Sequence, residues 1–211
     1  MKVEIWSDIF CPFCYIGKRR FENALNKFEN KEKVEVLFRS FELNPNAEKI
    51  NNNNIHEAIA EKYGIDYDEA KRNNNNIVKQ AKELGLDYNF DKLILNNSFD
   101  AHRMIYFANG FNKNNEMAEA LFKAYFIDSK NISDFDTLGD IASSVGLDKE
   151  EAIRVLNSDK YKKEVREDEE LARNYSITSV PTYIINNKFI ISGAQSEEIF
   201  LMALNRAAEV D

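Results

Sequence analysis

The chain has 211 residues, 44% of them hydrophobic and 30% charged, a composition typical of a globular protein with one domain and an insertion or two small domains. Its formal net charge is −8 and its basic residues are scattered among acidic ones. We therefore expect no binding to nucleic acid, which requires a clustered basic surface. We also expect no membrane span, because no stretch approaches ~18 consecutive apolar residues.

The N-terminus leads directly from Met1 into a strand pattern. Val3 and Ile5 alternate with polar neighbours, which predicts a half-buried strand. The segment has neither the apolar region nor the small-residue cleavage site of a signal peptide. With Met1 as the true start, the sequence predicts a cytoplasmic protein.

A helix and a second strand are predicted next. Apolar residues recur at i, i+3, i+4 and i+7, on one face of a helix: Phe21, Ala24, Leu25 and Phe28. Apolar residues then alternate again, as in a strand: Val34, Val36 and Phe38. A strand, helix and strand of this length predict a βαβ unit with parallel strands and a right-handed crossover.

The middle of the chain has helical periodicity. Two apolar stripes illustrate it: Met117, Ala120, Leu121 and Ala124, then Leu138, Ile141, Ala142 and Val145. Gly146 is expected just after one helix, and Asp148 with Glu151 resembles a capping box at the start of the next. We predict a helical subdomain at 46–158, inserted into an α/β domain formed by 1–45 and 159–211.

The last part of the chain returns to strands. Residues 159–170 hold ten charged residues in twelve, which is typical of a solvated helix face. Strands at 182–185 and 188–191 flank Asn186 and Asn187, a pair suited to a tight hairpin turn. Ser196 is the expected N-cap of a final helix.

Two asparagine runs, 51–54 and 73–76, interrupt the middle region. Asparagine is a mediocre helix former. We therefore expect both runs to be loops or neutral surface rather than sites.

The only two cysteines, Cys11 and Cys14, lie between the first strand and the first helix, separated by Pro12 and Phe13. Proline is favoured at the first helical position, so Pro12 places Cys11 at the N-cap. A helix N-terminus stabilises an anion by up to ~2 kcal/mol. The helix N-terminus therefore favours the thiolate of Cys11, which is the form that attacks disulfides. With a second cysteine three residues later, the motif favours redox chemistry.

Structural alternatives are weaker. A disulfide closing so short a loop contributes only roughly 2 kcal/mol, and cytoplasmic reductants oppose it. A zinc site needs four ligands, and the only obvious nitrogen ligands, His56 and His102, lack the spacing of a zinc finger. We therefore predict no metal site.

A proline opens one of the late strands. Pro181 follows Val180, and proline is tolerated at the first residue of a strand. A cis bond here would bring the Val180 backbone against a partner chain. Propensity alone favours trans, because only about 5–6% of X–Pro bonds are cis.

Together, the Cys-x-x-Cys motif and the late Val-Pro-Thr resemble the thioredoxin superfamily, and the helical insertion resembles its DsbA-like branch. Four segments look like the FrnE-like group: 7–18, 97–103, 120–126 and 191–195. The resemblance covers nearly the whole chain. It implies a thioredoxin fold, Cys11 as the attacking and Cys14 as the resolving cysteine, Pro181 in cis beside them, and an insertion that caps the active site.

The sequence departs from periplasmic DsbA at Phe13, which replaces the histidine between the cysteines. Loss of a cation that favours the thiolate predicts a less oxidising protein. The asparagine runs match no pattern of the group.

Other residues near the motif have more than one interpretation. Asp8 relays protons to Cys14 or, more commonly at a strand end, is a surface aspartate. His102 lies on an apolar helix, where a core or capping histidine is more usual than a catalytic one. Asn97 is a helix N-cap or reaches the cleft. Trp6 is expected in the core.

The leading functional hypothesis is a thiol–disulfide oxidoreductase or isomerase acting on protein thiols, protein disulfides or glutathione, without a metal or organic cofactor. A reducing cytoplasm favours reductase or isomerase action. Kappa-class glutathione transferases and 2-hydroxychromene-2-carboxylate isomerases share this layout but generally have serine at the position of Cys11. A peptide-binding or chaperone-like module is a third hypothesis, without direct support. The sequence does not indicate the oligomeric state.

Overall fold

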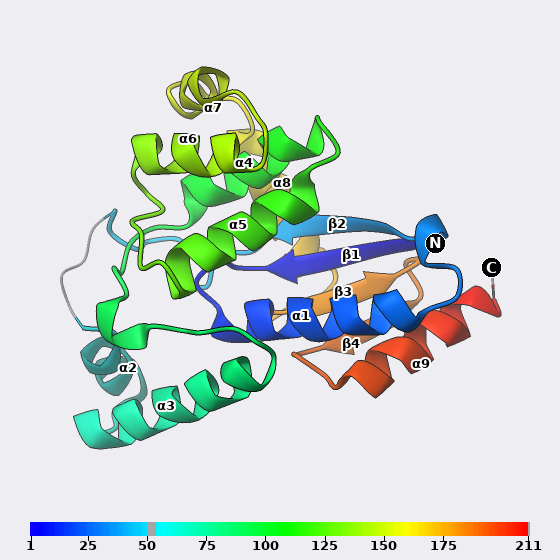
Figure 1. Cartoon of the computed structure of the whole chain (residues 1–211), viewed down its shortest axis with the longest axis horizontal. Coiled ribbons are helices and arrows are strands. Elements are labelled where there is room, and N and C mark those ends of the chain that lie inside the picture. Colours follow the sequence, from blue (N-terminus) through cyan, green and yellow to red (C-terminus); the bar gives the residue numbers. More distant parts are fainter. Residues whose placement is uncertain (50–53, 211) are drawn as a thin grey trace.

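The computed structural model describes residues 1–49 and 54–210 (Figure 1). Its strands form one mixed sheet in the order β2-β1-β3-β4. They are β1 (Lys2–Ser7), β2 (Glu35–Ser40), β3 (Thr182–Ile185) and β4 (Phe189–Ser192). β1 and β2 are parallel, whereas β3 is antiparallel to both β1 and β4. The parallel pair, joined through the first helix, confirms the predicted βαβ unit.

Helices occupy most of the remaining described chain. They are α1 (Pro12–Lys27), α2 (Ile55–Tyr63), α3 (Tyr67–Glu83), α4 (Phe99–Asn109), α5 (Asn114–Phe126), α6 (Phe135–Ser144), α7 (Lys149–Leu156), α8 (Lys162–Asn174) and α9 (Glu197–Ala208), with short 3-10 helices η1 (Lys31–Lys33) and η2 (Phe90–Lys92). None of these helices is both long and apolar enough to cross a membrane.

Helices α2 to α7 all lie between β2 and α8, in the segment predicted as an inserted subdomain. One apolar core runs from the sheet into these helices, and α5 packs against β2. The boundaries at 46 and 158 stay a prediction, since this shared core does not itself divide the chain into two units.

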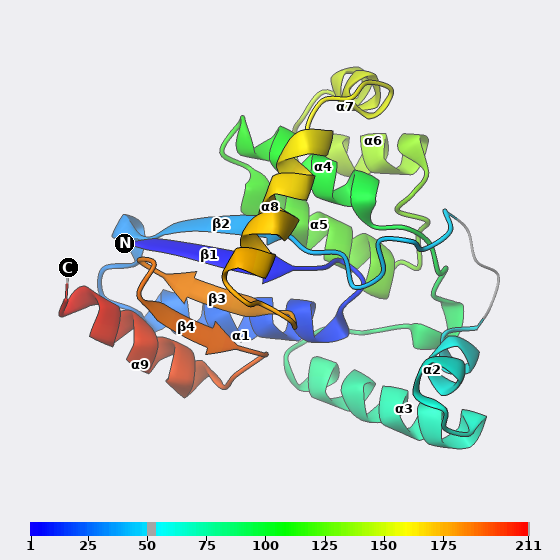
Figure 2. The same cartoon turned by 180° about the vertical axis from the view of Figure 1, so that it is seen from behind.

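β1 is buried on both faces, which corrects the half-buried strand predicted for it. Figure 2 shows α8 crossing the face of the sheet opposite to α1 and α9. On that face Trp6 packs with Ala172, and its indole N–H donates to the backbone oxygen of Asp168 at 3.1 Å. The polar member of the pattern, Glu4, is paired with Arg39 at 2.9 Å instead of being exposed to water.

The charged segment 159–170 is not only a solvated helix face, as was expected, because it carries a buried carboxylate. Asp168 is 2% exposed. It accepts hydrogen bonds from Arg39 Nη1 at 3.0 Å, Ser40 N at 2.8 Å and Tyr106 Oη at 2.6 Å. One face of α8 therefore ties β2 to α4, and a charge count along the segment gives no sign of this.

The hairpin turn, the glycine after α6 and the N-cap of α7 are found at the predicted residues. Asn186 and Asn187 have φ values of 50° and 54°, as a tight hairpin turn requires. Gly146 follows α6 with φ 79°. The Asp148 side chain accepts a hydrogen bond from Glu151 N at 2.6 Å and caps α7.

The asparagine run 73–76 lies in α3, so the prediction of a loop was wrong for it. Asn74 is 4% exposed, and its Nδ2 lies 2.9 Å from His56 Nδ1. His56 Nε2 in turn lies 3.1 Å from Asp91 Oδ1. A buried partner on α2 therefore overrides the weak helix propensity of asparagine. Of the run 51–54, only Asn54 is described, and its side chain accepts from His56 N at 2.7 Å as the N-cap of α2.

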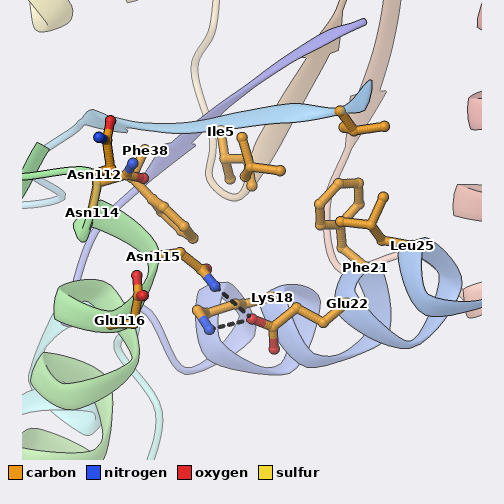
Figure 3. A pocket seen from close by; sticks show the side chains of 12 residues that line it. Ile5, Lys18, Phe21, Glu22, Leu25, Phe38, Asn112, Asn114, Asn115 and Glu116 are labelled. Carbon is orange, nitrogen blue, oxygen red and sulfur yellow. Dashed lines mark hydrogen bonds and ion pairs between the residues drawn. The ribbon is translucent and has the colours of Figure 1, made fainter. Parts of the chain in front are cut away.

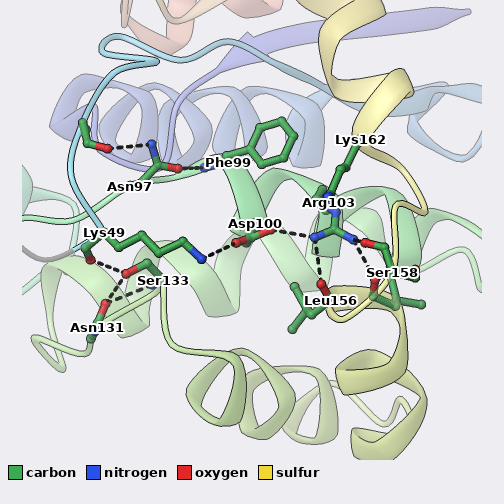
Figure 4. A network of polar contacts seen from close by, with 12 residues as sticks. Lys49, Asn97, Phe99, Asp100, Arg103, Asn131, Ser133, Leu156, Ser158 and Lys162 are labelled. Atoms are coloured by element: carbon green, nitrogen blue, oxygen red, sulfur yellow. Dashed lines mark hydrogen bonds and ion pairs between the residues drawn. The ribbon is translucent and has the colours of Figure 1, made fainter.

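Arg103 on α4 connects this helix to the segment between α7 and α8 (Figure 4). Its side chain is 1% exposed. It donates to five acceptors: Asp100 Oδ1 at 2.7 Å and the backbone oxygens of Val155 at 2.6 Å, Leu156 at 3.2 Å, Ser158 at 2.7 Å and Lys160 at 3.0 Å. Arg103 therefore donates to carbonyl groups at the C-terminal end of α7 and in the segment that follows it, where helical hydrogen bonds run out.

Candidate redox site

The predicted thiol pair lies at the N-terminus of α1, just beyond the C-terminal end of β1. Cys11 is the N-cap residue and Pro12 begins the helix, as predicted. Both thiols are free, and Cys11 and Cys14 are 5% and 2% exposed. Cys14 N donates to Cys11 O at 2.9 Å. The local sequence thus positions one thiol at the helix N-terminus and the other in the first turn of the helix.

The Val180–Pro181 segment lies beside this pair, and its peptide bond is cis. The Cys11 thiol donates to the Val180 carbonyl oxygen at 3.5 Å. A Cβ atom at Gly17 would lie 2.6 Å from Tyr183 Oη and 3.0 Å from Pro181 Cγ. Glycine at this position of α1 therefore permits the segment to approach the helix.

Cys14 lies in surroundings that keep its thiol protonated. Burial is the largest cause, followed by a hydrogen bond with Cys11 and the charge of that sulfur, and together they raise the pKa of Cys14 well above its ordinary value. The Ser7 side chain and the Asp8 backbone oppose this rise in pKa. Cys14 must therefore lose a proton before it can act as a nucleophile.

Asp8 is fully buried, so the expectation of a surface aspartate was wrong. Its Oδ2 accepts from Leu43 N at 2.7 Å and its Oδ1 from Phe10 N at 3.2 Å. Its backbone oxygen accepts from Cys11 N at 3.0 Å. Asp8 therefore holds the turn that leads from β1 into the cysteine motif, and the loop after β2 covers it.

A buried histidine and a second carboxyl group belong to the same region. His102 is 1% exposed, and its Nε2 lies 3.5 Å from Asp8 Oδ1. Burial alone would lower the pKa of His102, but Asp8, Glu42 and Glu169 more than offset this and raise it. Burial raises the pKa of Glu42 to about 7, against the lowering effects of His102 and Arg166. We term Asp8, His102 and Glu42 the acid–base cluster.

Glu42 carries no signal in the sequence that marks it as a site residue. Glu42 follows β2 and lies between the apolar residues Phe41 and Leu43. It is only 7% exposed, and this burial depends on contacts from segments that are distant in the sequence. His102 was expected to be a core histidine, and the structure places it beside the turn that precedes Cys11.

The acid–base cluster predicts that the free energy of unfolding falls as the pH rises from about 5 to 8. A folded-state pKa above the unfolded value means that the folded protein holds the proton more tightly. The contribution of Glu42 is complete below its unfolded pKa of about 4.3 and is lost as the pH rises through about 7. The contribution of His102 is complete below its unfolded pKa of about 6.5. It is lost as the pH rises through the raised pKa of the folded state.

Thermal denaturation between pH 5 and 8 measures this dependence. We expect Glu42→Gln to flatten the slope between pH 5 and 7, and Glu29→Gln, at an exposed position, to leave it unchanged. An identical slope in the Glu42→Gln variant and the parent would show that the cluster does not control it.

Helix α5 and the segment before η2 cover α1. Tyr88 Oη donates to the Pro12 backbone oxygen at 2.8 Å, and Tyr15 Oη donates to Glu119 Oε1 at 2.7 Å. Lys18 is 1% exposed and donates to Glu119 Oε2 at 2.7 Å and to Glu22 Oε1 at 2.6 Å. These contacts hold the helix that carries the cysteines against the inserted helices.

A cavity of about 270 Å³ opens beside Lys18 and Glu22, between α1, β2 and the α4–α5 loop (Figure 3). Its floor is apolar, with Phe21 and Phe38 among its residues, and neither cysteine lines it. This cavity is therefore separate from the thiol pair.

The remaining candidate residues, Asn97 and Trp6, have structural roles. Asn97 Oδ1 accepts from Phe99 N at 2.9 Å and its Nδ2 donates to Ala47 O at 3.1 Å (Figure 4). Asn97 therefore bonds to the first residue of α4, but the N-cap residue is Ser98, one position after the predicted one. Trp6 is in the core, as predicted. Within 1–49 and 54–210, no group of three or more His, Cys, Asp or Glu residues could hold a metal ion.

A mixed sheet with helices on both faces, a Cys-x-x-Cys pair at the start of the first helix and helices inserted before the last two strands define a DsbA-like thioredoxin fold. Residues 2–205 match the family of the DSBA-like thioredoxin domain. The chain belongs to that family, and the finer FrnE-like grouping stays a prediction.

Individual proteins resemble the chain over nearly its whole length. A probable DsbA oxidoreductase from Streptomyces coelicolor has a TM-score of 0.94 and 36% identity, covering 99% of this chain and 90% of that one. Protein YwbO of Bacillus subtilis (strain 168) is 30% identical over 211 residues, covering 96% of this chain and 95% of YwbO. A 2-hydroxychromene-2-carboxylate isomerase has a TM-score of 0.71 and 14% identity, covering 99% and 97%. At that identity, the last likeness shows the fold alone.

Proposed function

We propose that the chain is a thiol–disulfide oxidoreductase or disulfide isomerase in which Cys11 attacks and Cys14 resolves. The observation that carries this proposal is the pair of free thiols at the start of α1, with Cys11 at the N-cap and 3.5 Å from the Val180 carbonyl oxygen. The family match, whose members include DsbA oxidoreductases, supports it.

The proposed reaction has two steps. The Cys11 thiolate attacks one sulfur of a substrate disulfide, forms a mixed disulfide and releases the other substrate sulfur as a thiolate. Cys14 then loses its proton and attacks the Cys11 sulfur, and the second substrate thiolate leaves and takes up a proton. The substrate gains two electrons and the Cys11–Cys14 pair loses two. Two thiols, for example two molecules of glutathione, reduce the pair back to the dithiol and leave joined as a disulfide.

Val180 and Pro181 form the proposed substrate-binding segment. In the free protein the Val180 carbonyl accepts a hydrogen bond from the Cys11 thiol. A mixed disulfide at Cys11 has no thiol hydrogen, so the Val180 carbonyl becomes available to a backbone N–H of the bound substrate.

The direction of electron flow follows from the compartment and from the residue between the cysteines. We place the protein in the cytoplasm, where the dithiol form and reductase or isomerase action are favoured. Phe13 is 40% exposed and supplies no cation beside the thiolate. We therefore expect a less oxidising pair than in periplasmic DsbA.

The test is the equilibrium reduction potential of the pair in glutathione buffers, with Cys11→Ser as the control. We expect a reversible two-electron transition that is absent from the variant, with a midpoint below that of DsbA at about −120 mV. If no disulfide forms across the accessible range, the redox function fails. Glutathione-dependent isomerase or transferase activity would then be the function to assay.

A further inference from the structure

Ser7 is the last residue of β1, and its hydroxyl group is buried without a partner. The residue is 4% exposed, and Oγ has no hydrogen-bond partner among the described residues. Buried hydroxyl groups are nearly always hydrogen-bonded, because an unpaired one loses the bonds that it makes in water. A partner that forms only during a reaction is one reason for a protein to retain such a group.

The geometry of β1 directs the Ser7 side chain toward α1. Successive side chains of a strand point to opposite faces of the sheet, so Ser7 shares a face with Ile5. Trp6 points to the other face, where it packs with Ala172 of α8. Ile5 belongs to the core on the α1 side and lines a cavity together with Phe21 of α1 (Figure 3). The Ser7 hydroxyl therefore lies on the face that α1 covers.

Cys14, in the first turn of α1, is the reactive group on this side of the sheet that Ser7 affects. It is 2% exposed and belongs to the same apolar core as Ile5. Burial is the largest influence on the pKa of Cys14 and raises it, as does Cys11, whereas the Ser7 side chain, as a donor to the thiolate form, lowers it. Ser7 is therefore placed to stabilise a charge on the resolving sulfur.

The resolving step is the moment at which that charge forms. Cys14 must lose its proton before its sulfur attacks Cys11, and a buried thiolate has no surrounding water to stabilise it. A hydroxyl group that is already buried beside the sulfur needs neither desolvation nor rearrangement when the charge appears. A hydrogen bond to a charged acceptor is also stronger than one to a neutral acceptor. The donor therefore favours the thiolate selectively over the thiol.

We propose that Ser7 donates a hydrogen bond from Oγ to the Cys14 thiolate during the resolving step and so speeds closure of the Cys11–Cys14 disulfide. The inference rests on the proposed function, because it assigns Ser7 to the second step of that reaction. Cys14 gives its proton to water, and Ser7 keeps its own. The thiolate then forms the bond to the Cys11 sulfur as the bond from that sulfur to the substrate breaks, and the substrate leaves as a thiolate.

The test is the reaction of the reduced full chain with 5,5′-dithiobis(2-nitrobenzoate) at neutral pH. Attack by Cys11 releases one coloured thionitrobenzoate at a rate proportional to the reagent concentration. Attack by Cys14 on the resulting mixed disulfide releases the second at a rate that does not depend on this concentration. The Cys14→Ser variant, which should show the first release alone, identifies the second phase.

Ser7→Ala should slow the second release about three- to tenfold and leave the first release unchanged. Loss of a hydrogen bond to a charged group makes the Cys14 thiolate roughly ten- to hundredfold rarer. The thiolate that remains is more nucleophilic, which offsets about half of this effect on a logarithmic scale. Because Oγ has no partner in the dithiol protein, Ser7→Ala should unfold at no lower temperature than the parent and have the same reduction potential.

Ser40→Ala is the matched control. Ser40 of β2 pairs with Ser7 in the register of the two parallel strands, so its side chain points to the same face, and it is 3% exposed. The variant removes an equally buried hydroxyl group one strand away, and the bond from Ser40 N to Asp168 is retained because it is a backbone bond. We expect both releases to stay at the parent rates.

Several outcomes overturn the inference. A second release at the parent rate in Ser7→Ala, or an equal slowing in Ser40→Ala, would show that the Ser7 hydroxyl does not assist Cys14. Slowing that comes with a lower unfolding temperature or a slower first release would show disturbed packing instead. A parent that releases no thionitrobenzoate would overturn the proposed function, and the inference with it. The first release in the parent therefore separates the two failures.

Discussion

Replacement of Cys14 by serine is expected to convert the protein into one that captures its substrates as stable mixed disulfides. The variant keeps Cys11 at the N-cap of α1, so the first attack still occurs. It lacks the thiol that would displace the substrate, so the mixed disulfide persists until an external thiol reduces it. Serine is only slightly smaller than cysteine. The packing around Cys14, which is 2% exposed, should therefore be retained in the variant.

The measurement is the mass of the protein after incubation with a disulfide-linked peptide, together with its steady-state turnover. We expect one peptide per chain for Cys14→Ser and none for Cys11→Ser, with turnover reduced roughly 10³-fold or more in both. A Cys14→Ser variant that turns over at the parent rate, or an adduct on Cys11→Ser, would exclude the assigned roles of the two cysteines.

The parts of the site that the sequence predicted are those that neighbouring residues determine. Pro12 at the first helical position sets Cys11 at the N-cap, and asparagine tolerates the positive φ values found at Asn186 and Asn187. These preferences act within a few residues. Pattern and spacing are therefore sufficient to locate both the thiol pair and the hairpin.

The parts that could not be predicted depend on contacts between distant segments. Asp8 follows a strand and appears exposed in the sequence, but Leu43 N donates to it across 35 positions and His102 of α4 faces it. Trp6 bonds to Asp168 across 162 positions, and this contact places α8 on the sheet. Burial imposed by a remote element has no signature in the local charge pattern.

The resemblance to a known family predicted only some of the features of the site and the fold. It indicated Pro181 and the inserted helices, because these follow from shared motifs. It did not indicate the pairing of Asn74 with His56, since the asparagine runs match no pattern of the group. Features that are particular to this chain depend on its own packing and not on motifs shared with the family.

Replacement of Arg103 by methionine is expected to lower the free energy of unfolding by about 3–5 kcal/mol, the range for breaking one partner of a buried ion pair. Methionine retains an apolar stem of similar length but donates no hydrogen bonds. The change leaves Asp100 without its 2.7 Å partner and removes the Arg103 donors from the backbone oxygens of Leu156, Ser158 and Lys160. The Val155 oxygen loses Arg103 as well but keeps Ser158 N and Ser158 Oγ as donors. At this chain length the midpoint of thermal denaturation should fall by roughly 10 °C.

Two further variants separate charge from geometry. Arg154→Met removes an arginine that is 68% exposed and whose nearest carboxylates lie 3.8 Å away, so we expect a change within about 0.5 kcal/mol. Arg103→Lys keeps the positive charge but cannot reach five acceptors, so it should lose most of the stability that Arg103→Met loses. If Arg103→Lys were as stable as the parent, the charge pair with Asp100 would be sufficient. The lysine ammonium group supplies the same charge but lacks the planar set of N–H donors of the guanidinium. Equal stability would therefore show that the hydrogen bonds to the carbonyl groups contribute little.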